Sequence, residues 1–290
     1  MRRYGRIKRI LAGLLAVTIV LCTIPVQDVD AAKRGWKKKD GEKYYILSSG
    51  KKAVGSCRIK GKYYVFDRKG KLLTPKKKSL ADVGKKSYYV NSAGMAVSGW
   101  QIINKKLYNV KQTGEIRKNV KYKGIVFTDT GAARECQDTV TMIQTVKTVN
   151  TVTKPEMTKK QKLRACWKYM VSRKRFRYVS KYPDLNQKGW QRITAEDMLR
   201  TKKGNCYSFA CAFAAMANVI GYDAYVICGR INGRRDRARD GLTRHAWVRI
   251  DGKNYDPEAH FAGWGKNIYG RKRYPVRRYT IQRKVQYWKY

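Results

Sequence analysis

The stretch GNCYSFACAFAAMANVIG, residues 204–221, decides the fold of the second half of this 290-residue chain. Residues 202–205 are predicted as a loop. Residues 206–220, dense in Ala and Phe, are predicted as an apolar helix, with Gly221 just past its end as a C-terminal cap. The pattern therefore places Cys206 where a strongly apolar helix starts.

The position of Cys206 suggests a chemical role. Free backbone N–H groups and the helix dipole favour negative charge at a helix N-terminus, so we expect a lowered thiol pKa and a populated thiolate. Lys202 and Lys203 act in the same direction. Cys211 lies five residues on, on another face, and is predicted to be core. The alternative is that Cys206 is also a small core residue.

A base and an acid that could serve this thiol follow in TRHAWVRIDGKNYDPEAHF, residues 243–261. His245 and Trp247 are predicted on one face of a strand, and Asp251-Gly252 is typical of a two-residue hairpin turn. This register pairs Trp247 with Asp256 and puts Asp256 diagonally beside His245. One extra residue in the turn would move Asp256 to the opposite face. The second histidine of the chain, His260, is predicted to be structural.

Three pieces of this half, GNCYSFACAF, RHAWVRI and YDPE, together resemble the transglutaminase-like superfamily from about residue 160 to 260. The resemblance implies a papain-like α+β domain over residues 160–290 and acyl transfer through a thioester. It implies Cys206 as nucleophile, His245 as base and Asp256 as orienting acid. The family also uses an upstream donor for the oxyanion, for which Trp190 and Gln191 are the candidates, beside the Cys206 backbone N–H.

The outcome of the reaction stays open. Water would make the chain a protease or amidase, and an amine would make it a cross-linker of protein glutamine. A papain-like peptidoglycan endopeptidase is one alternative, although such enzymes usually show Asp-Cys-Ser where this chain has Asn-Cys-Tyr. A non-catalytic wall adhesin is another. The enzyme hypothesis requires that the three side chains touch and that solvent can reach the sulfur.

Residues 33–133 repeat with a period near twenty residues, each unit being a short aromatic strand, a turn ending in Gly and a second strand. One hairpin cannot bury its own face, so the units are predicted to stack into a β-solenoid. The turns end at Gly50, Gly70, Gly94, Gly114 and Gly131. The repeats resemble the cell-wall-binding (choline-binding type) repeats of Gram-positive surface proteins.

That resemblance implies aromatic cages for quaternary ammonium groups. Two units lack the expected Trp, and a cationic solenoid would repel choline, so we expect binding to an anionic wall polymer or peptidoglycan instead. The candidate aromatics are Trp36, Tyr44, Tyr45, Tyr63, Tyr64, Tyr88, Tyr89, Trp100 and Tyr108. For most of the tyrosines, a place in the solenoid core is the alternative.

The N-terminus, residues 1–31, is typical of a secretory signal peptide, with basic MRRYGRIKR, an apolar run and VDAA before the cleavage site. No later stretch is apolar enough to span a membrane, so a secreted, wall-associated protein is expected. The net charge is +46, of which residues 1–31 contribute +3. Such charge indicates anionic wall partners or simply a solvated surface, and in an exported protein nucleic acid is not expected.

Residues 134–159 are rich in Thr and Val and are predicted as a linker with at most a short strand. An amphipathic helix follows within residues 156–173, and a shorter one is predicted to begin at Thr194. Six cysteines remain after signal cleavage, and their spacing does not fit a disulfide framework. With no C-x-x-C pair and two histidines, no metal site is expected, and no cofactor is implied.

Overall fold

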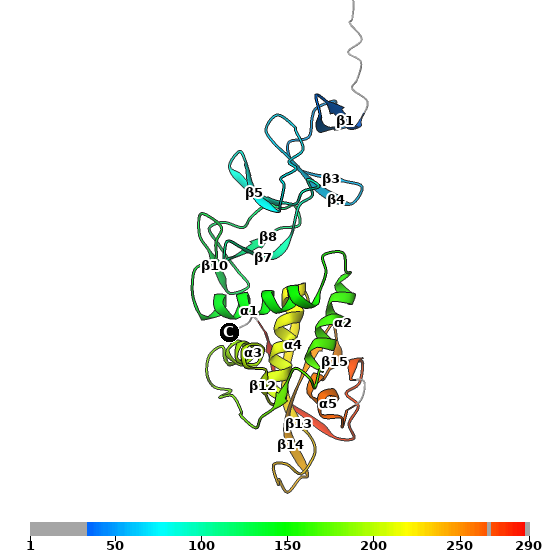
Figure 1. The fold of residues 1–290 in the computed structure, drawn as a ribbon. Coiled ribbons are helices and arrows are strands. Elements are labelled where there is room, and N and C mark those ends of the chain that lie inside the picture. Colours follow the sequence, from blue (N-terminus) through cyan, green and yellow to red (C-terminus); the bar gives the residue numbers. More distant parts are fainter. Residues whose placement is uncertain (1–33, 266–267, 288–290) are drawn as a thin grey trace, which may run out of the picture.

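A computed structural model of the chain describes residues 34–265 and 268–287 (Figure 1). It shows a column of β-hairpins followed by a domain of four helices and a five-stranded sheet, with a further helix, α1, lying between the two parts. The predicted signal peptide, residues 1–31, lies outside the described residues. Among the described residues, no helix has the length and apolar character needed to cross a membrane.

Ten short strands form five antiparallel hairpins in the first part. They are β1 Gly35–Lys39 with β2 Glu42–Ile46, β3 Gly55–Ile59 with β4 Lys62–Phe66, β5 Ser79–Val83 with β6 Lys86–Val90, β7 Gly99–Ile103 with β8 Lys106–Val110, and β9 Val120–Tyr122 with β10 Ile125–Phe127. The aromatic residues fall in the strands as the repeat predicts.

Successive hairpins are joined by a repeated backbone hydrogen bond. The segment after one hairpin donates an N–H to the second strand of the hairpin before it, as from Leu72 to the Lys43 carbonyl (2.8 Å) and from Ala133 to the Leu107 carbonyl (2.8 Å). The glycine that ends each turn has φ between +75° and +84°. At Gly131 a Cβ would also lie 2.3 Å from Ile116, so the stack needs glycine there for space as well as for φ. The predicted stacking is confirmed.

The expectation of a linker over residues 134–159 is wrong in its secondary structure, because α1 (Gln137–Val152) fills most of it. Thr and Val are weak helix formers, which hid the helix from a sequence reading. Tertiary packing overrides this, as Met142 and Val146 pack on Trp100, Leu107 and other residues of the last hairpins. Buried threonine hydroxyls bond carbonyls one turn back, so they cost little when buried.

The second part is an α+β domain, as expected. Its helices are α2 Lys159–Met170, α3 Trp190–Thr201, α4 Cys206–Ile220 and α5 Pro257–Ala262. Two short strands, β11 Arg177–Tyr178 and β12 Lys203–Gly204, pair with each other. The main sheet is antiparallel, in the order β16 (Tyr269–Arg271), β15 (Lys253–Tyr255), β14 (Leu242–Ile250), β13 (Ala224–Asn232) and β17 (Tyr279–Gln286).

Helix α4 is the centre of this domain. Every residue from Cys206 to Asn218 is buried, against β13 and β14 on one side and α1, α2 and α3 on the others. Its bounds are as predicted, with Gly221 in a left-handed cap. Helix α3 begins at Trp190, four residues before the predicted start at Thr194, because Gly189 at φ +76° ends the preceding loop. Helix α4 contacts both β14, which carries His245, and α5, which Asp256 caps.

Candidate active site

Cys206 is the first residue of α4, held there by a polar cap. The Asn205 side chain accepts hydrogen bonds from the backbone N–H groups of Tyr207 (3.1 Å) and Ser208 (3.4 Å). Its amide in turn donates to the Lys181 carbonyl (2.9 Å). Asn205 therefore fixes the start of the helix, and with it the sulfur, relative to the loop before α3.

His245 and Asp256 come together through the predicted hairpin. The β14–β15 register pairs Ile250 with Lys253 and Val248 with Tyr255, across a turn in which both Asp251 (φ +48°) and Gly252 (φ +72°) are left-handed. His245 Nε2 lies 2.6 Å from Asp256 Oδ2, and both side chains are buried.

The thiol of Cys206 lies close enough to His245 for the two groups to interact electrostatically. Because Nε2 is taken by Asp256, Nδ1 is the ring nitrogen left for the thiol. Burial alone would lower the pKa of His245, but the charge of Asp256, the charge of Cys206 and the bond to Asp256 raise it well above its ordinary value. The imidazole thus stands between a sulfur and a carboxylate, with one ring nitrogen for each.

Asp256 holds more than the histidine. Its Oδ1 accepts the Ala259 N–H (2.9 Å) and caps α5, while Oδ2 also accepts the hydroxyl of Tyr274. Burial raises the pKa of Tyr274 and the charge of Asp256 raises it further, so the tyrosine is a donor here. With both oxygens occupied by donors, the carboxylate is locked in one orientation.

Glu258 is a second buried carboxyl at the site. Its Oε2 lies 4.0 Å from His245 Nδ1, and its side chain bonds Trp264. Burial raises the pKa of Glu258, His245 opposes that rise and Asp256 adds to it, giving about 7. His245, Asp256 and Glu258 have ligand atoms within 4.8 Å of one another. They fit a metal poorly, because Asp256 already bonds the imidazole and both of its oxygens accept from further donors, Ala259 and Tyr274.

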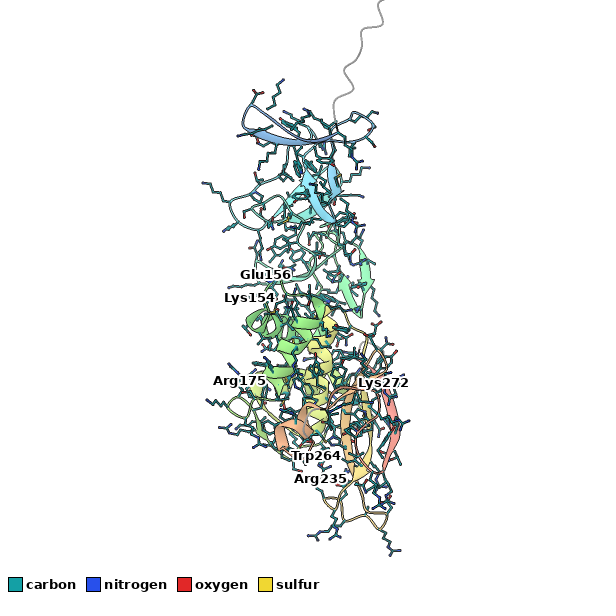
Figure 2. All side chains as sticks on the ribbon, turned by 90° about the vertical axis from the view of Figure 1, so that its right-hand side faces the viewer. Lys154, Glu156, Arg175, Arg235, Trp264 and Lys272 are labelled. Carbon is teal, nitrogen blue, oxygen red and sulfur yellow. The ribbon has the colours of Figure 1, made fainter. Side chains whose placement is uncertain are left out.

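The sulfur is not reachable from solvent in this structure, which goes against the second requirement of the enzyme hypothesis. Cys206 has 0% of its surface exposed. Tyr178 and Arg235 lie close enough to interact with its charge, and the Trp264 ring stands edge-on to His245 at 5.2 Å. The Arg235 side chain is 37% exposed and Trp264 is 47% exposed. Both are labelled in Figure 2, at the end of the domain away from the hairpins.

The two residues expected to supply an oxyanion donor are used elsewhere. Gln191 Nε2 donates to the Tyr287 carbonyl (3.1 Å), and Trp190 packs edge-on against Tyr207. Their place at the start of α3 explains this, since that turn packs into the core. Sequence reasoning missed Tyr274, Trp264 and Arg235, which lie on loops with no local pattern. Glu258 is the last residue of the YDPE motif, residues 255–258, but no role was predicted for it.

Burial divides the aromatic residues expected to bind the wall. Tyr88, Tyr89, Trp100 and Tyr108 are 5–8% exposed and form core, so for these four the structure contradicts a binding role. Trp36 is 41% exposed and contacts Tyr45 (5.3 Å) and Tyr64 (5.1 Å). Tyr44, Tyr45, Tyr63 and Tyr64 are half-buried, and the Lys52 ammonium already lies 4.1 Å over the Tyr44 ring.

Comparison with known proteins gives a family for the second part. Residues 146–256 match the model of the transglutaminase-like superfamily, a stretch that begins inside α1 and ends at Asp256. No curated protein matches the chain.

Several solved structures match about a third of this chain. Choline binding protein F of Streptococcus pneumoniae, solved with a peptidoglycan analogue, is 26% identical over 35% of this chain and 40% of its own, with a TM-score of 0.20. The choline binding domain of Spr1274 from the same organism is 23% identical over 36% of this chain and 99% of its own, with a TM-score of 0.15. An alternansucrase in complex with isomaltononaose is 26% identical over 35% of this chain and 8% of its own, with a TM-score of 0.23. Residues 146–256 thus match a transglutaminase-like domain, which follows five paired hairpins in the described part of the chain.

Proposed function

We propose that this chain is a secreted, wall-associated thiol acyl-transfer enzyme that acts on amide bonds of proteins or peptides. The observation that carries the proposal is His245, whose ring bonds Asp256 and interacts electrostatically with the Cys206 thiol at the start of α4. A nucleophile, a base and a group that fixes the base are the parts that covalent catalysis needs. Cys206, His245 and Asp256 take these roles in that order.

The reaction follows from the two ring nitrogens. His245 Nδ1 takes the thiol proton, and the sulfur attacks the amide carbonyl, whose oxygen becomes an oxyanion facing the Cys206 N–H. The C–N bond then breaks, the leaving amine or ammonia takes the proton from His245, and a thioester remains on Cys206. Water or a second amine attacks the thioester, losing a proton to His245, and the thiol is restored. Asp256 stabilises the imidazolium in each step.

This chemistry requires the side chains above Cys206 to move, because the sulfur is buried in this structure. Arg235 and Trp264 are exposed and lie on loops, so they are the groups we assign to this movement. The same burial favours the second candidate, a wall adhesin in which the domain binds and does not react. A peptidoglycan endopeptidase would share the chemistry and differ in substrate.

One assay separates these functions. The chain is incubated with a glutamine-rich protein and a labelled primary amine, and separately with purified peptidoglycan, while ammonia, amine incorporation and new amino termini are measured. We expect ammonia or new termini in excess of amine incorporation, and loss of every signal in Cys206→Ala. Amine incorporation in excess would make it a cross-linker, and activity on peptidoglycan alone an endopeptidase. If the wild type gave no more signal than the Cys206→Ala variant, the chain would be the non-catalytic wall adhesin.

We further propose that the first hairpins bind an anionic wall polymer through Trp36. A cavity of about 440 Å³ is lined by Trp36 and Tyr64 together with Lys37, Lys38 and Lys43. The faces of the aromatic rings can pack against a sugar. The lysines attract phosphate or carboxylate groups, whereas they would repel the cation of choline.

The wall proposal predicts a charge-dependent loss of binding. Replacing Lys37, Lys38 and Lys43 by Gln should lower the fraction of protein that sediments with Gram-positive walls several-fold at low salt. The control replaces three exposed lysines of the second domain, Lys160, Lys168 and Lys174. Elution of the wild type by choline, or unchanged binding of the variant, would contradict the proposal.

A further inference from the structure

The loop between β13 and β14, residues 233–241, differs in charge chemistry from the rest of this basic chain. Residues 230–244 contain six Arg, two Asp and no Lys. The repeat region, residues 33–133, has 22 Lys and four Arg. A guanidinium presents a planar pair of donors that match a carboxylate, whereas an ammonium is a point charge. The loop is therefore built for pairing with planar anions.

Both aspartates of the loop are used to hold its shape. Asp240 accepts from Arg230 Nη2 (2.9 Å) and from the Leu242 N–H (3.0 Å). Asp236 accepts from the backbone N–H (2.7 Å) and Nε (3.1 Å) of Arg244. The pairs neutralise Arg230 and Arg244 and anchor the loop at both ends.

Arg235 joins the loop to the reacting groups. It donates through Nη2 to the carbonyl of Arg244, the residue before His245, and through Nη1 to the Tyr178 hydroxyl (3.4 Å). Burial would lower the pKa of Arg235, but nearby negative charge, that of Cys206 first, raises it. Arg235 is thus bonded to the strand that carries His245 while its side chain is 37% exposed.

The remaining arginines of the loop are available to a ligand. Arg234, Arg237 and Arg239 are exposed, and none of them forms a salt bridge with an acidic side chain of the described residues. They leave an excess of positive charge on the loop that carries Arg235. Figure 2 places Arg235 and Trp264 in the part of the domain away from the hairpins, so this charge is separate from the Trp36 cavity.

We propose that residues 233–241 form the binding site for an acidic peptide, with Arg235 pairing a carboxylate next to the amide that Cys206 attacks. The inference rests on the proposed function. A substrate carboxylate would replace the Tyr178 hydroxyl and the Arg244 carbonyl, compete with Asp236, which lies 3.4 Å from Arg235 Nε, and draw the guanidinium away from the strand that carries His245. Substrate binding and access to Cys206 would then be the same event, which accounts for a buried nucleophile in the unliganded chain.

The first test uses two alkylating agents of equal reach, anionic iodoacetate and neutral iodoacetamide. The rate with iodoacetate divided by the rate with iodoacetamide is measured at Cys206 and at Cys136, an exposed cysteine in the same chain. Both rates depend equally on opening of the site, so the ratio reports local charge. We expect the ratio at Cys206 to exceed that at Cys136 about five-fold at low salt and to fall with added salt.

Replacing Arg234, Arg237 and Arg239 by Gln should bring the two ratios together, while the control variant with Lys160, Lys168 and Lys174 changed to Gln should not. Equal ratios in the wild type would overturn the site. Because alkylation needs no turnover, this result is independent of whether the chain proves to be an enzyme.

The second test identifies the ligand. A glutamate-rich peptide, a lysine-rich peptide and a polyglycerol phosphate are each added, and the rate of iodoacetamide reaction at Cys206 is followed by mass spectrometry. We expect only the glutamate-rich peptide to change that rate at low concentration, and Arg235→Gln to remove the change. An effect of polyglycerol phosphate alone would replace the peptide by a wall polymer and overturn the assignment.

Discussion

Replacing Asp256 by Asn should lower the rate of ammonia release by about three orders of magnitude while the chain stays folded. The reason is the pattern of donors around the carboxylate. Asp256 Oδ2 accepts hydrogen bonds from both His245 Nε2 and the Tyr274 hydroxyl. In the variant, an amide NH₂ takes the place of Oδ2 and cannot accept either bond. Nε2 of His245 must then accept a hydrogen bond from this amide, so the ring proton moves to Nδ1. A protonated Nδ1 cannot take the proton of the Cys206 thiol.

A matched variant isolates the histidine contact. Tyr274→Phe removes the second donor and keeps the carboxylate, so it should cost less than about tenfold in rate. Activity is followed by ammonia release, and folding by thermal denaturation. If Asp256→Asn kept more than a tenth of the wild-type rate, Asp256 would be only a cap for α5, a role that Asn Oδ1 can preserve towards Ala259.

The part of the site predictable from sequence is the part fixed by local rules. A two-residue Asp-Gly turn sets the register of β14 and β15, and the register brings His245 to Asp256. A helix that starts directly after a polar cap sets the place of Cys206. These rules act over a few residues, so a sequence displays them.

Contacts between distant segments were not predictable in this way. Tyr274 is 18 residues from Asp256 in the chain, and Arg235 meets Tyr178 from 57 residues away. Nothing in the residues around them marks these partners. The closure of the site over Cys206 depends on such contacts, which is why an accessible thiol was expected and a buried one is found.

Helix α1 shows the opposite failure, where a local rule gave the wrong answer. Thr and Val at this density favour strand or loop. The helix forms because Met142, Val146 and Val149 fill two cores, one shared with the hairpins and one with the second domain. Its stability comes from surfaces that only the folded chain provides.

Replacing Glu258 by Gln should stabilise the chain at pH 8.5 and have little effect at pH 4.5. The pKa of Glu258 is raised from 4.5 to about 7, so between these values the native state holds a proton that the unfolded state releases. Stability therefore falls as pH rises through this window, by about 3 kcal/mol in all. The side chain is 6% exposed, so solvent screens little of this cost.

Glutamine has the same shape and no charge to desolvate, and its oxygen can keep the bond to Trp264. We expect the midpoint of thermal unfolding at pH 8.5 to rise by about 6 °C or more, with Glu156→Gln, an exposed change, as control. An equal rise at both pH values would mean that packing, and not ionisation, sets the effect. A rise confined to high pH would show that Glu258 is kept beside His245 at a cost in stability, as expected of a carboxyl retained for its position in the site.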